Sequence, residues 1–551
     1  MKKDVTMKKT SFVKGAFITT FGIVLAKLLG AFYVIPFHAL IGDAGGALFG
    51  YAYTVYTFFM AFATAGIPFA ISKLVSEYQA LGYFQAKLKV FRVGKLLSLV
   101  LGLLSFFIVF FFAPILAKFV LGNVEGGNQI EDVIFVIRVI AASLLIVPIL
   151  GIYRGYFEGH RYMTPPSVSQ VIEQIIRILV ILCGSYLGVK TFHLPLKSTV
   201  GISLFGTFMG AFSGYFYLVL KKKNNHKKFQ EKIRPVNEPI VTNQVIFKKI
   251  ISYALPFIII DVFKSLYNLV DMFIVVKKLV SIAGYSAAQA EMVYGMLSTW
   301  ANKFSTIVLV LSTGVIVSLV PNLTESLVKK DEKRIQRTIL QTLSILLYFL
   351  IPLTLGISFL STPIWKFFYG DSVYGPSVLG YHIFTSLFIS LFTTMIIVLQ
   401  VLKEYRTVAI SLISGFLLKL FLNHNLIFTF YHMEFPPYYG VITASIIGYF
   451  VSFLICILKI RSLYQLHFED VIKSFIDILC GSVLMILLLS GLKLLLPFTI
   501  EGRVINFFYI LLYGVFGIII YGIYTYKVGL VDKIFGKRYI SNLMRKIGQK
   551  K

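Results

Sequence analysis

Long apolar segments follow one another along almost the whole chain, separated by short polar segments. Most of them reach about 20 residues, the length an α-helix needs to cross a hydrocarbon core of ~30 Å. The pattern therefore predicts an all-α polytopic membrane protein with about fourteen transmembrane helices. The expected spans are residues 15–40, 45–72, 96–117, 133–153, 167–189, 199–220, 250–276, 292–321, 338–360, 375–402, 407–430, 438–458, 474–497 and 504–526.

The longest hydrophilic break, residues 221–244, separates the sixth span from the seventh. It predicts a six-helix lobe at 1–220, a basic linker at 221–249, a second six-helix lobe at 250–460, two additional helices at 461–526 and a basic tail at 527–551. The ends of spans two and eight align at one offset, with Glu77 matching Glu325. Six helices per lobe would make the two lobes parallel repeats, an arrangement that recurs in transporters with the substrate site between the halves.

Composition and charge fit this fold class. The 551 residues are 57% hydrophobic and only 14% charged, which excludes a soluble globular protein. The net charge of +29 does not indicate nucleic acid, because 39 of the 53 Lys and Arg residues fall in the segments on the side of the N-terminus. This asymmetry predicts a multi-pass protein of the cytoplasmic membrane with both termini cytoplasmic and the basic tail against membrane lipids.

Polar and ionisable side chains inside the spans are the candidate site, because such residues normally face a bundle interior or a water-filled cavity. Asp261, Lys264, Asn268 and Asp271 have helical spacing and share an arc of about 80°. The candidate cavity residues are Lys27, Arg138, Glu173, Arg177, Asp261, Lys264, Asn268, Asp271, Lys303 and Lys419.

Two interpretations of these residues compete. Glu173–Arg177 and Asp261–Lys264 could be ion pairs that only tie helices together. Alternatively, they line a hydrated cavity, which the excess of cations over acids favours. A net positive cavity implies an anionic substrate, and phosphate is the commonest such group. Lys27 belongs to this set, since it lies about twelve residues into the first apolar run, or roughly 18 Å deep.

Motifs of enzymes and cofactor sites are missing. The sequence has no P-loop, no H-E-x-x-H, no G-x-S-x-G and no aspartate-rich diphosphate–metal motif. We therefore predict neither an enzyme nor a bound cofactor or metal.

Three stretches resemble a known family: "AKLLGAFYVIP", "AGIPFAISKLVSEY" and "YRGYFEGHRYMTPPSVSQVIEQIIRI" at residues 153–178. They are similar to the lipid II flippases of bacterial cell-wall synthesis (MurJ-type), with most similarity to the YtgP/SpoVB-like branch. This family belongs to the multidrug/oligosaccharidyl-lipid/polysaccharide exporter superfamily. In the third stretch we expect Gly155 and Gly159 to permit a tight turn and Pro165–Pro166 to begin the next span.

The resemblance implies alternating access by two lobes around a cationic cavity that accepts the diphosphate and sugar–peptide head of undecaprenyl-linked lipid II. It also implies a groove for the lipid tail at the two extra spans. The sequence departs from the family's arginine-rich first helices, since it has Lys27 in span one and Tyr51, Tyr53 and Tyr56 in span two. The family's arginines are therefore not transferred. Energy coupling stays open between the membrane potential and an ion gradient.

Alternative functions follow from the same features. Another undecaprenyl-diphosphate-linked glycan would need the same diphosphate chemistry as lipid II. A drug/cation antiporter would favour an acidic cavity, and a membrane enzyme would need clustered acids or His/Arg motifs. The expected partners are lipid II or a related glycan lipid, membrane lipids and, as candidate protein partners, cell-wall synthesis or division proteins, with no nucleic acid.

Overall fold

The computed structural model describes residues 29–30, 32–122, 127–225, 239–498 and 502–535. Within these ranges the regular elements are helices, without a strand. Twelve long helical segments there are apolar enough to cross a membrane. The prediction of an all-α polytopic membrane protein is therefore confirmed, and fourteen spans is an approximate count.

Two of the expected spans are not among these twelve segments. Most of the first one, including Lys27, lies outside the described residues. The seventh corresponds to α10 (Asn243–Ala283), a continuous helix of 41 residues. Asp261, Lys264 and Asp271 lie along α10 among apolar residues.

The chain forms two compact units, which are described separately. Unit 1 comprises residues 1–300 and 423–441, and unit 2 comprises residues 301–422 and 442–551. This division differs from the expected lobes, because α10 and the helix after it belong to the first unit. The boundaries of the repeat-based lobes remain a prediction.

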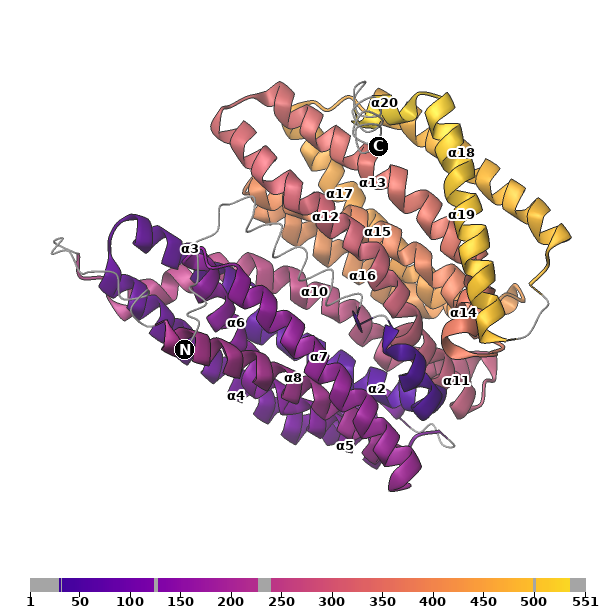
Figure 1. Cartoon of the computed structure of the whole chain (residues 1–551), viewed down its shortest axis with the longest axis horizontal. Helices are drawn as coiled ribbons and strands as arrows, with labels where there is room; N and C mark the ends of the chain where they lie inside the picture. Colours follow the sequence, from indigo (N-terminus) through magenta and orange to yellow (C-terminus); the bar gives the residue numbers. More distant parts are fainter. Residues whose placement is uncertain (1–28, 31, 123–126, 226–238, 499–501, 536–551) are drawn as a thin grey trace, which may run out of the picture. The chain divides into compact units, whose positions relative to one another are not determined.

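Unit 1 is built from helices that pack around a shared apolar core. Its helices are α2 (Val34–Thr64), α3 (Ile67–Ala80), α4 (Phe84–Leu121), α5 (Ile130–Ala141), α6 (Ser143–Gly159), α7 (Thr164–Tyr186), α8 (Leu196–Asn224), α10 and α11 (Ala287–Gly295). Figure 1 shows α7 and α8 lying side by side, and they share the most extensive helix–helix contact of the chain. A core of buried residues such as Leu74, Val90 and Tyr156 joins α3, α4 and α6.

The turn between α6 and α7 differs from the expectation. Gly155 and Gly159 lie inside α6, and the reversal follows them, with Arg161 at φ 63°. A Cβ on Gly155 would lie 2.3 Å from the backbone oxygen of Pro68, so this glycine is needed for close packing of α6 on α3. The role of these glycines as turn residues was therefore predicted wrongly. Pro165 does stand in the first turn of α7, as predicted.

Unit 2 contains the second set of helices. They are α12 (Ala301–Val328), α13 (Glu332–Phe359), α14 (Ser361–Tyr369), α15 (Gly375–Val401), most of α16 (Tyr405–His432) and of α17 (Tyr438–Tyr464), α18 (Glu469–Leu495), α19 (Arg503–Lys527) and α20 (Leu530–Phe535). Helix α12 packs on α15, and α18 packs on both α13 and α19.

Candidate functional site

A cluster of two arginines and one glutamate lies inside unit 1. Glu173 of α7 accepts a 2.7 Å ion pair from Arg154 Nη2 on α6 and a 2.8 Å ion pair from Arg177 Nη2 one turn along α7. Arg154 Nε also donates to Ser169 Oγ at 2.9 Å. All three charged side chains are less than 20% exposed. One carboxylate therefore serves two guanidinium groups, so these three side chains together carry one surplus positive charge. Glu158, one turn after Arg154 on α6, lies within electrostatic range of Arg154.

The local sequence explains how this cluster forms. Ser169, Glu173 and Arg177 are spaced at i, i+4 and i+8, so they lie along one face of α7. Helix α8 packs closely behind them, since a Cβ on Gly210 would lie 2.6 Å from the backbone oxygen of Glu173. The contact leaves room for only a hydrogen at that position, and it fixes α7 against α8.

The cluster also keeps an unused donor. Arg177 Nε is buried and has no hydrogen-bond partner among the described residues. Tyr53 and Tyr56 of α2 lie within electrostatic range of the Arg177 guanidinium. Tyrosine hydroxyls and guanidinium groups are donors of the kinds that can hold phosphate oxygens.

The polar stripe of α10 lies away from its packed face. Asp261 and Asn268 are exposed and Lys264 is partly exposed, whereas Ile260 and Tyr267 between them are buried. Asp271 accepts a 3.1 Å hydrogen bond from Asn423 Nδ2 in the same unit. The exposed part of the stripe is consistent with a water-facing surface, which remains a prediction.

The remaining predicted cations have different surroundings. Arg138 donates from Nε to the backbone oxygen of Phe110 at 3.2 Å and stacks on its ring, so it contacts α4. In unit 2, Lys419 is 1% exposed and donates to Ser445 Oγ at 2.9 Å, and Lys303 is partly exposed on α12. Within unit 1 the structure therefore brings Glu173 and Arg177 together and places Arg138 against α4, whereas Lys303 and Lys419 belong to unit 2.

Arg154 is the member of the cluster that sequence reasoning missed. The expected fourth span ends at residue 153, one position before it. Helix α6 continues to Gly159, so Arg154 is helical and faces α7. The sequence does contain a signal for this longer helix. Between Tyr153 and Gly159 there is no proline, and glycine is the only residue type that disfavours a helix.

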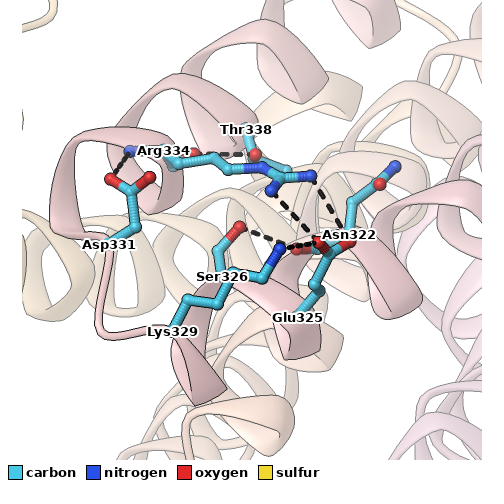
Figure 2. A network of polar contacts seen from close by, with 7 residues as sticks. All are labelled: Asn322, Glu325, Ser326, Lys329, Asp331, Arg334 and Thr338. Atoms are coloured by element: carbon cyan, nitrogen blue, oxygen red, sulfur yellow. Dashed lines mark hydrogen bonds and ion pairs between the residues drawn. The ribbon is translucent and has the colours of Figure 1, made fainter.

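A second polar network lies where α12 ends and α13 begins (Figure 2). Glu325 accepts from Lys329 at 2.5 Å and from both terminal nitrogens of Arg334 at 3.3 and 3.4 Å. Asp331 caps α13 by accepting from the Arg334 backbone N–H at 3.0 Å. In unit 1, the aligned acid Glu77 forms a 3.1 Å ion pair with Lys249. Both acids thus bind basic side chains at the end of the equivalent predicted span.

An apolar groove of about 650 Å³ opens in unit 2. Its walls come from α13, α15, α17 and α18, with side chains such as Leu347, Leu387, Phe453 and Leu479. Of the two extra C-terminal helices, α18 lines this groove, and no residue of α19 does among those described.

Known proteins have sequences similar to this chain. A family model described as "Polysaccharide biosynthesis protein" matches residues 12–327. The lipid II flippase MurJ of Bacillus subtilis (strain 168) is 32% identical over 540 residues, which cover 96% of this chain and 97% of that protein. Stage V sporulation protein B of the same organism is 28% identical over 60% of this chain and 61% of its own length.

Solved structures show the same fold. A lipid II flippase MurJ in an inward closed conformation matches with a TM-score of 0.67 at 16% identity, covering 93% of this chain and 99% of that one. An inward-facing multidrug resistance MATE family transporter of the MOP superfamily matches with a TM-score of 0.62 at 14% identity, over 82% and 98% of the two chains. The MurJ flippases and the MATE family transporter are transporters rather than enzymes, as expected. This multi-pass membrane protein belongs to the polysaccharide biosynthesis protein family and, within it, to the family of the MurJ lipid II flippases.

Proposed function

We propose that this protein is a flippase that moves undecaprenyl-diphosphate-linked lipid II from the inner to the outer leaflet of the bacterial cytoplasmic membrane. The observation that carries the proposal is the surplus cation at Arg154, Glu173 and Arg177 in a chain related over nearly its whole length to a lipid II flippase. A diphosphate supplies the missing negative charge and several strong acceptor oxygens.

In the proposed mechanism the headgroup binds in a cavity that opens alternately to the two sides of the membrane. Arg177 and Arg154 attract the diphosphate, and Glu173 keeps both guanidinium groups oriented while the site is empty. The surplus charge is small, so the diphosphate is only partly neutralised and is not trapped. Asp261 and Asn268, which are exposed on α10, and Lys264, which is partly exposed, hydrate the path of the sugar–peptide head.

The apolar groove of unit 2 is the site proposed for the undecaprenyl chain. Its lining is almost entirely aliphatic and aromatic. A long isoprenoid chain would keep apolar surroundings there while its headgroup crosses the membrane. Both termini and the basic linker at 221–249 are proposed to be cytoplasmic, because most basic side chains fall on that side.

The test is depletion of this protein in a bacterial strain in which it is the sole flippase, with lipid II measured separately in each leaflet. We expect lipid II to accumulate in the inner leaflet and to disappear from the outer one. Arg177→Gln should reproduce the defect, whereas Lys190→Gln, which removes an exposed cation beyond the end of α7, should not. Unchanged outer-leaflet lipid II after depletion would reject the proposed substrate, and accumulation of a different undecaprenyl-linked glycan would identify the alternative.

A further inference from the structure

A small polar pocket adjoins one end of the apolar groove in unit 2. It has a volume of about 400 Å³ and is formed at the end of α17 and in the turn before α18, by Leu458, Arg461, Ser462, Gln465, Leu466 and His467. Leu458 and Arg461 line both the pocket and the groove. The two hollows are therefore adjacent, and the polar one lies at the end of α17.

The pocket has the charge of an anion site. Its potentially charged lining groups are Arg461 and His467, and no acid lines it. Nearby Lys459 is paired with Glu404 at 3.6 Å, but the exposed Arg461 guanidinium has no ion-pair or hydrogen-bond partner among the described residues. A guanidinium offers five donors in a fixed fork that matches phosphate oxygens.

We infer that this pocket is the loading site at which the diphosphate of an undecaprenyl-linked lipid binds at the inner-leaflet surface while its chain enters the groove. The inference rests on the proposed function, which requires the substrate to enter from the inner leaflet. The end of α17 and the turn at 465–468 lie on the predicted cytoplasmic side, where the headgroups of inner-leaflet lipids are found. The occupant is thus fixed at both ends, by an apolar groove for the chain and by Arg461 for the phosphates.

The dimensions support a diphosphate rather than the whole headgroup. A hollow of 400 Å³ is at the small end of ligand pockets, so a disaccharide that carries a peptide remains outside it, in water. The site therefore recognises the part that all undecaprenyl-diphosphate lipids share. Discrimination between glycans must occur elsewhere in the protein.

The test measures binding of undecaprenyl diphosphate to the purified full-length protein in nanodiscs. Arg461→Gln should weaken binding about three- to tenfold, because it removes a charge-assisted contact at a partly solvated site. Arg461→Lys should keep most of the affinity, and Lys473→Gln, which removes an exposed cation outside the pocket, should have no effect. Binding of undecaprenol, which has no phosphate, should be the same in all four proteins.

Groove variants test the other end of the ligand. Leu479→Trp should fill the groove and weaken the binding of both undecaprenyl diphosphate and undecaprenol. Leu487→Trp, on an exposed face of the same helix, should leave the binding of both unchanged. Equal affinity of Arg461→Gln and the unchanged protein for undecaprenyl diphosphate would overturn the inference, as would displacement by phosphatidylglycerol at the same concentration. If Arg461-dependent binding is observed but lipid II is not translocated, the proposed function fails and the loading site stands.

Discussion

Arg154 of α6 and Glu173 of α7 are joined by a 2.7 Å ion pair, and Arg177 occupies the other carboxylate oxygen of Glu173. The arrangement answers the question of whether Glu173 and Arg177 merely neutralise each other. They do form an ion pair, but the third residue leaves the group positively charged. A structural tie between helices and the proposed site for an anion are thus combined in one cluster.

Stability should respond differently to each member of this cluster. Glu173→Gln leaves two guanidinium groups without a carboxylate and should lower the free energy of unfolding by about 3–5 kcal/mol. Arg154→Gln leaves a neutral Glu173–Arg177 pair and should cost about 1–2 kcal/mol. Thermal unfolding of the purified proteins in detergent measures the order. A less stable Arg154→Gln than Glu173→Gln would contradict the assignment of Glu173 as the shared partner.

Transport should depend on the net charge of this cluster rather than on the stability of the protein. Arg154→Gln and Arg177→Gln both bring the cluster to zero net charge, so we expect each to lose most lipid II translocation while the protein remains folded. Translocation by Arg154→Lys should be partly retained, because the charge stays but the simultaneous contacts of the guanidinium with Ser169 and Glu173 are lost. Lipid II in the outer leaflet, normalised to protein in the membrane, is the measurement. Normal translocation by Arg154→Gln would show that the surplus charge is not used.

Gly210 should tolerate no side chain, because a Cβ there would meet the backbone oxygen of Glu173 at 2.6 Å. We expect Gly210→Ala to lower the free energy of unfolding by about 1–3 kcal/mol and to impair transport by shifting α7. Gly522→Ala is the matched control, since nothing lies within 4 Å of a Cβ at that helical position. Similar melting temperatures for the two variants would mean that α7 and α8 are less closely packed than described.

The stripe of α10 should be accessible to water. In a protein whose native cysteines are replaced, cysteines at positions 261 and 268 should react with a small water-soluble thiol reagent, and cysteines at the buried positions 260 and 267 should not. Lys264→Ala should impair transport without unfolding the protein. Equal protection of all four cysteines, together with full activity of Lys264→Ala, would support the helix-tying interpretation.

The sequence predicted the helical fold and offered the ion pair of Glu173 with Arg177 as one of two interpretations, because both depend on local periodicity. It did not predict Arg154 as their partner, since a contact between two helices depends on where α6 ends and which way it faces. Gly155 was misassigned for a similar reason. Glycine permits turns and close helix contacts alike, and only the position of Pro68 distinguishes them.

The sequence also did not predict how deeply the isolated cations are buried or which residues they contact. Lys419 and Arg138 have the same apolar context along the chain, yet one is buried against Ser445 and the other lies against α4. Hydropathy gives the depth of a residue but not the neighbour that it meets. Lys27 lies outside the described residues, and its contribution to the diphosphate site remains a prediction, tested by the loss of translocation expected for Lys27→Ala.

The most direct test of the central claim is translocation by the purified protein alone. Lipid II is placed in the outer leaflet of vesicles that contain the reconstituted protein, and the fraction protected from an impermeant headgroup-modifying reagent is measured over time, with a membrane potential and an ion gradient applied separately. We predict protected lipid II in vesicles with the unchanged protein and background levels with Arg177→Gln. Equal protection with the two proteins, or protection no greater than in protein-free vesicles under every gradient, would contradict the account.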